Sequence, residues 1–96
     1  MPELIPIQDQ GDGVQAVMGR DLHAFLECKE RYTQWIARHI EKYGFVAGQD
    51  FIREMGKSTG GRPSENHVLT MDMAKELAML QGNPKGKQAR QYFIAA

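Results

Sequence analysis

The residue types best suited to chemistry in this chain are three histidines, His23, His39 and His67, and a single cysteine, Cys28. Their spacing matches no zinc-binding pattern, and the sequence places no base beside Cys28 to activate it. Asp21 and His23 share a helical segment, but two residues apart they point to different faces. No Gly-rich phosphate-binding motif is present. The sequence therefore indicates neither an enzyme nor a protein that binds a metal or another cofactor.

Side chains that could contact a partner fall in three places along the chain. The first is the outer face of a helix expected over 31–42, the second a Gly-rich loop, and the third the last expected helix. Each group could meet phosphates or an acidic protein surface, and the alternative for each is ordinary solvated surface. The candidate contact residues are Arg31, Gln34, Arg38, Lys57, Arg62, Lys85, Lys87 and Arg90.

Hydrophobic periodicity predicts the elements that would position these side chains. The order strand, two helices, β-hairpin, two helices predicts an α+β fold, a small winged-helix-like domain. In such a domain the first two helices form a candidate helix-turn-helix and the hairpin a wing, the alternative being an ordinary helical hairpin. The expected ranges are a strand at 14–17, helices at about 20–27 and 31–42, strands at 51–54 and 68–70 around a long loop at 55–67, and helices at about 71–81 and from 85 onward.

Capping signals and apolar faces support the helices one by one. Gly44 is placed to end the second helix in a left-handed conformation, and Thr70 is a good N-cap for the third. Met71, Met73 and Met79 lie near that third helix, either as core residues or as an adaptable protein-binding surface. The expected core faces are Tyr32, Trp35, Ile36, Ile40 and Tyr43, then Met73, Ala74, Leu77 and Ala78, then Ala89, Tyr92, Phe93 and Ala96.

The composition is that of one small domain. The 96 residues carry 12 Lys plus Arg and 12 Asp plus Glu, so the total charge selects no class of partner. The charge is uneven, because residues 1–13 carry acids without Lys or Arg and residues 77–96 carry cations without acids. One cysteine and no apolar run of membrane-spanning length predict a protein of a reducing cytoplasm with no membrane partner.

Residues 1–13 are expected to form an extended arm, and residues 14–96 a single domain. Leu4, Ile5 and Ile7 could dock the arm on the core or on a partner subunit, and we expect a homo-oligomer, a dimer or a tetramer. The last helix ends without a capping residue, which predicts the amino-terminal piece of a longer protein.

The chain resembles the AntA/AntB antirepressor domain of temperate phages and prophages. Two positions depart from the family pattern. Met18-Gly19 stands in place of a small capping residue such as Ser followed by Ala, and Lys87 stands in place of Arg, which keeps the charge but loses the bidentate fork. The resemblance covers nearly the whole chain, and its most specific blocks are Leu69-Thr70-Met71-Asp72-Met73-Ala74-Lys75-Glu76-Leu77-Ala78-Met79 and Lys85-Gly86-Lys87-Gln88-Ala89-Arg90-Gln91-Tyr92-Phe93-Ile94, with further matches at 20–23, 25–26, 35–36, 43–45, 48, 50–51 and 61–63.

The resemblance implies a non-enzymatic regulator in the cytoplasm of a bacterial host cell. Such a protein binds a phage repressor and blocks its operator binding, which favours lytic induction. It could cover the basic DNA-reading surface of the repressor with acids, for which Glu3, Asp9, Asp12 and Glu65 are candidates. It could instead bind elsewhere and favour a repressor arrangement that does not fit the operator. The alternative function is a winged-helix-type DNA-binding module of a phage regulatory protein.

Overall fold

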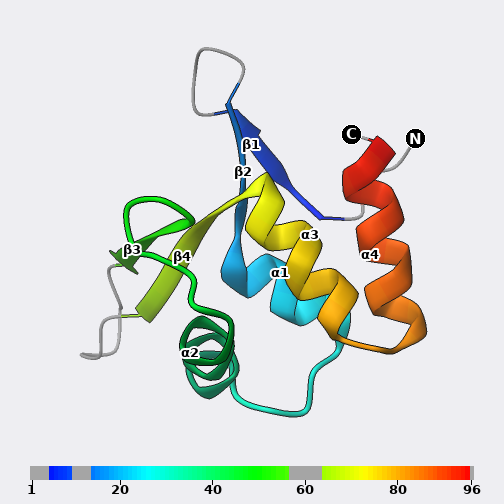
Figure 1. Ribbon diagram of the computed structural model, residues 1–96, viewed down its shortest axis with the longest axis horizontal. Helices are drawn as coiled ribbons and strands as arrows, with labels where there is room; N and C mark the ends of the chain where they lie inside the picture. The colour runs from blue at the N-terminus through cyan, green and yellow to red at the C-terminus, as the bar shows by residue number, and fades with distance from the viewer. Residues whose placement is uncertain (1–4, 10–13, 57–63, 96) are drawn as a thin grey trace.

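A computed structural model describes residues 5–9, 14–56 and 64–95 of the chain (Figure 1). Four antiparallel strands form one sheet in the order β1-β2-β4-β3. The fold is α+β, as predicted, and it is compatible with a winged-helix-like arrangement. The elements are β1 (Ile7–Asp9), β2 (Gln15–Met18), α1 (Gly19–Leu26), α2 (Tyr32–Tyr43), β3 (Phe51–Gly56), β4 (Ser64–Thr70), α3 (Met71–Leu80) and α4 (Pro84–Ala95).

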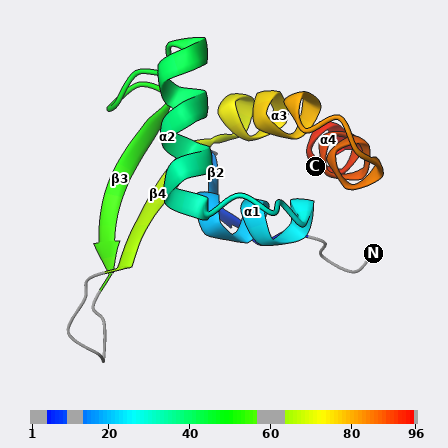
Figure 2. The same ribbon diagram turned by 90° about the horizontal axis from the view of Figure 1, so that it is seen from below.

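One row of apolar side chains crosses all four strands and forms the floor of the core. Ile7 pairs with Val17, Val17 with Leu69, and Leu69 with Phe51. Because residues opposite each other in register share a face, all four side chains point to the same side of the sheet. The last three are buried, and Ile7 packs against them. In both views α3 and α4 lie together on one side of the molecule, and the β3–β4 hairpin lies on the other (Figures 1 and 2).

The described part of the expected arm pairs with the rest of the chain. β1 lies antiparallel to β2, and Ile5 just before it is fully buried in the chain's own core. The sequence allowed docking on the core or on a partner subunit, and for Ile5 the core is the observed site.

The hairpin strands are longer than predicted. The ladder runs from Phe51 opposite Leu69 to Gly56 opposite Ser64, so residues 55–56 and 64–67 of the expected loop are strand, and residues 57–63 lie outside the described residues. Polar residues such as Asn66 and His67 gave no strand signal in the sequence, because their β-propensity is low. Tertiary contacts decide their conformation.

The first helix receives its cap from β4. Met18 offers no side-chain cap, as the sequence suggested, but the Asn66 Oδ1 accepts from the backbone N–H of Arg20 at 3.1 Å and from that of His67 at 2.8 Å. A Cβ at Gly19 would collide with the Tyr32 hydroxyl. Glycine in place of the expected alanine therefore makes room for that ring.

The second helix ends at the predicted Gly44, which has φ +70°, but its buried face differs from the expected one. Tyr32, Trp35 and Ile36 are buried as predicted, whereas Tyr43 is 44% exposed. His39 is buried instead. Its Nδ1 donates a hydrogen bond to the Trp35 carbonyl at 2.9 Å, so this N–H is not left unpaired in the interior.

The last two helices form a tight hairpin (Figure 2). Thr70 caps α3 by accepting from the Met73 N–H at 3.2 Å, and all four predicted core residues of α3 are buried. The predicted chain break at 81–84 contains a second cap, because the Asn83 Oδ1 accepts from the Gly86 N–H at 2.8 Å. Pro84 occupies the first helical position, where its missing N–H costs nothing. Of the helices described, none has both the length and the hydrophobicity that spanning a membrane requires.

Candidate interaction surfaces

The predicted contact residues on α2 are exposed, but one of them is already paired. The Nη2 of Arg38 lies 2.8 Å from Oε1 of Glu30, and its Nε donates to Oε2 at 3.2 Å. This two-pronged contact holds the pKa of the Glu30 carboxyl below its usual range. Arg31, at the N-cap, and Gln34 point into solvent. The charge of this face is therefore partly neutralised within the chain.

The wing carries a paired charge in its described part. Lys57 and Arg62, the two predicted contacts of this segment, lie outside the described residues. In the described hairpin, the Nε of Arg53 on β3 lies 3.1 Å from Oε1 of Glu65 on β4. Glu65, considered from the sequence as an acid that could imitate DNA, thus already faces a cation.

The three cations of α4 separate into two groups. The Nζ of Lys85 lies 5.0 Å from the centre of the Phe25 ring, so this side chain is directed at α1. Lys87 and Arg90 are exposed and line a surface hollow of about 620 Å³ together with Met79. The Asn83 Nδ2 donates to the Leu26 carbonyl at 3.3 Å and ties the start of α4 to the end of α1.

A neighbouring hollow of about 240 Å³ also includes Met79. It is lined by Tyr43 of α2 and by Glu76, Met79 and Leu80 of α3. Met79 is 55% exposed, so α3 combines a buried core methionine, Met73, with one that lies on the surface. Met73 is therefore a core residue, and a protein-binding role for Met79 stays a prediction.

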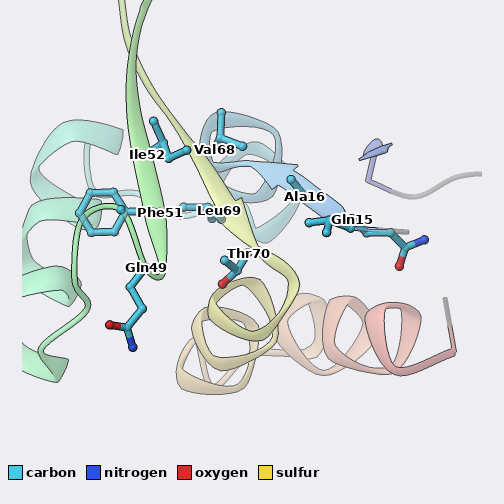
Figure 3. A pocket seen from close by; sticks show the side chains of 10 residues that line it. Gln15, Ala16, Gln49, Phe51, Ile52, Val68, Leu69 and Thr70 are labelled. Carbon is cyan, nitrogen blue, oxygen red and sulfur yellow. The ribbon is translucent and has the colours of Figure 1, made fainter. Parts of the chain in front are cut away.

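Sequence reasoning missed a third hollow, of about 210 Å³, on the sheet (Figure 3). Ile52 and Val68 lie opposite each other in the β3–β4 ladder and stand side by side in Figure 3. Ile52 is 61% exposed, and no charged residue lines the hollow. The signal was present in the sequence, because strand alternation places Ile52 outward whenever Phe51 points inward.

The histidines, scattered in sequence, meet in a chain of rings through the core. Ring centres of Phe51 and His67, His67 and Tyr32, and Trp35 and His39 lie 5.6, 5.6 and 5.3 Å apart. The Tyr32 hydroxyl lies 2.6 Å from Nδ1 of His67. Burial lowers the pKa of both His67 and His39. Neutral, hydrogen-bonded imidazoles of this kind act as packing residues.

Cys28 lacks the properties of an activated nucleophile. Burial raises the pKa of the Cys28 thiol, which is opposite to the shift that activates a nucleophile. Across 5–9, 14–56 and 64–95, no three or more His, Cys, Asp and Glu side chains could together hold a metal ion. The surfaces above are suited to binding.

Comparison with known proteins gives one family. The model of the AntA/AntB antirepressor family matches residues 17–83, from β2 to the turn between α3 and α4. No curated protein and no solved structure matched the chain. Because the matched segment covers more than half of the sequence, the chain belongs to the AntA/AntB antirepressor family.

Proposed function

We propose that this protein is a phage or prophage antirepressor that binds a phage repressor through protein–protein contacts. Binding would prevent the repressor from holding its operators and so release lytic genes in the cytoplasm of the bacterial host. The observation that carries the proposal is the family match over residues 17–83. A regulatory, non-enzymatic role follows from the same family membership.

The surface chemistry supports a protein partner over duplex DNA. Arg38 and Arg53 are paired with acids, and Lys85 lies over an aromatic ring. Tight duplex binding requires several phosphate contacts, and paired cations release few counterions. Exposed apolar side chains, by contrast, lie in each of the three hollows, and such patches commonly mark protein-binding sites.

A gel-shift assay tests the proposal directly. The repressor encoded by the same phage is bound to its labelled operator, and the purified chain is then titrated in. We expect the retarded repressor–operator band to be replaced by free operator. Persistence of that band at high excess of the chain would contradict the proposal for that repressor.

The same gel addresses the alternative of a DNA-binding module. The chain is mixed with the labelled operator without repressor at low salt. We expect free operator to migrate unchanged. A shifted band that disappears steeply as salt rises would favour the winged-helix DNA-binding function instead.

The homo-oligomer, a dimer or a tetramer, stays a prediction. Its support came from three apolar residues of the arm, of which Ile5 is buried in the chain's own core and Ile7 packs against it. Light scattering at high concentration measures the state, and a monomer there would contradict the prediction.

A further inference from the structure

The hollow between α3 and α4 combines an exposed apolar floor with unopposed positive charge. α3 and α4 approach closely at Gly86, whose position leaves no room for a Cβ, since that atom would lie 2.6 Å from the Ala78 carbonyl oxygen. This approach sets the cations of α4 beside the exposed end of α3. Met79 lies between Lys87 and Arg90 on one side and the Tyr43–Leu80 hollow on the other.

The charges of this hollow have no counterpart in the part of the chain that the structure describes. Neither Lys87 nor Arg90 makes an ion pair there, and no acid lines the hollow. α4 itself contains no Asp or Glu. The hollow thus differs from the α2 face, where Glu30 neutralises Arg38.

These features define the chemistry of the occupant. A flexible thioether suits an apolar side chain of variable shape, and a guanidinium such as that of Arg90 can donate two parallel hydrogen bonds to a carboxylate. An amphipathic segment with apolar anchors and flanking acids would satisfy both, in the manner of a helix laid in a groove. Two cations beside an apolar floor are too few phosphate contacts for a duplex.

We infer that the α3–α4 hollow, with Met79 at its floor and Lys87 and Arg90 at its rim, is where the antirepressor docks an acidic, amphipathic segment of the repressor. This inference depends on the proposed function and adds the surface and the partner chemistry. It also selects between the two routes of antirepression. A basic docking surface repels the basic DNA-reading surface of a repressor, so the contact lies elsewhere on the repressor and disfavours the operator-bound arrangement.

Calorimetric titration of the full chain into the repressor, without DNA, tests the inference. Lys87→Glu combined with Arg90→Glu reverses both rim charges, and we expect it to weaken repressor binding by about tenfold or more, because like charges then face each other. Lys29→Glu combined with Lys42→Glu is the matched control, since it makes the same change in net charge at two exposed residues that neither line the hollow nor belong to the predicted contacts. The control should retain affinity within about twofold.

A second variant addresses the apolar floor. Met79→Asp places a carboxylate where an apolar anchor would lie and should also weaken binding by about tenfold, whereas Met79→Leu should preserve it. Thermal unfolding of every variant verifies that it is folded, which is expected because all substituted side chains are exposed.

The outcomes separate this inference from the proposed function. If the wild-type chain does not bind the repressor, the proposed function fails and the inference fails with it. If the wild type binds and the two hollow variants bind equally well, the inference alone is wrong. Loss of self-association in the hollow variants, with unchanged repressor binding, would assign the hollow to a second copy of the chain and equally overturn it. Selective loss of repressor binding in the hollow variants supports it.

Discussion

α2 and α4 are both twelve-residue helices with exposed cations, yet their charges have different surroundings. On α2, Arg38 is held by Glu30. On α4, Lys87 and Arg90 border an apolar hollow that contains no acid. A count of cations would rank the two faces alike, whereas the neighbouring residues neutralise a cation on α2 and place no acid in the hollow beside the α4 cations, which is why we propose docking at α4 and not at α2.

The helices also differ in how they are anchored. α2 packs through the aromatic Trp35 and through the buried imidazole of His39, and its Tyr32 contacts the buried His67 of β4. α4 packs through Phe93 and through the small residues Gly86 and Ala89, which allow its close approach to α3. The α2 region therefore depends on buried polar groups, and the α3–α4 hairpin depends on backbone proximity.

The largest expected effect comes from removing either anchor. Phe93→Ala and Trp35→Ala should each lower the free energy of unfolding by about 3–5 kcal/mol, because both rings are fully buried. Ile94→Ala is the matched control on α4; that side chain is 56% exposed, and its loss should cost about 0.5 kcal/mol or less. Urea unfolding measures all three. Equal costs for Phe93 and Ile94 would mean that α4 does not pack as described.

The close approach of α3 and α4 at Gly86 determines whether Gly86→Ala stabilises or destabilises the protein. Helix propensity alone would make Gly86→Ala stabilising by up to about 1 kcal/mol. The contact with the Ala78 backbone reverses this, and we expect a net loss of about 1–3 kcal/mol. Thermal unfolding distinguishes the two, and a raised melting temperature would show that α3 and α4 are not so closely packed.

Acid should weaken the α2 region before the α3–α4 hairpin. Burial lowers the pKa of His39 and His67 in the folded state below the ordinary value of about 6.5 that applies on unfolding. The unfolded chain then binds protons that the folded chain does not, so stability is fully present above that value and falls as the pH drops below it. α3 and α4 contain no histidine.

Residue-resolved amide exchange between about pH 7 and pH 5 tests this ordering, since the window is set by the histidine pKa. The acids and cations near His67 are Glu65, Arg53 and Arg20. Exchange should accelerate first in α2 and β4. Earlier acceleration in α4 would contradict the assignment of the buried imidazoles as the acid-sensitive element.

The smallest effect is expected at the α2 ion pair. Arg38→Ala removes a contact between two exposed side chains, and pairs of this kind contribute little to stability. The melting temperature and repressor affinity should both stay close to those of the wild type. A large loss of repressor affinity would make α2 a docking face and would remove the contrast with α4.

The sequence predicts those parts of the fold that depend on local signals. α3 is the clearest case, since the Thr70 cap and the core face from Met73 to Ala78 follow from neighbouring residues alone. The cap of α1 was out of reach, because it comes from Asn66, 46 residues away. Burial of His67 was missed for the same reason, since its partner Tyr32 lies in another element.

The candidate surface was likewise predictable only where it depends on local signals. The spacing of Lys87 and Arg90 places them on one helical face, and both line one hollow. The apolar floor of that hollow comes from α3, and the pairing of Arg38 with Glu30 depends on the bend before α2. Periodicity could therefore predict which cations are exposed. Tertiary contacts were needed to show which of them are already paired within the chain.

The central claim is that the chain releases a repressor from its operator by docking at the α3–α4 hollow. The most direct measurement is the fluorescence anisotropy of a labelled operator bound to its repressor. The wild-type chain and the Lys29/Lys42 charge-reversed control should lower the anisotropy to the value of free operator. The Lys87/Arg90 charge-reversed variant should require about tenfold more protein to do so. An anisotropy that stays constant or rises with wild-type chain would contradict antirepression, and identical curves for all three proteins would contradict docking at the α3–α4 hollow.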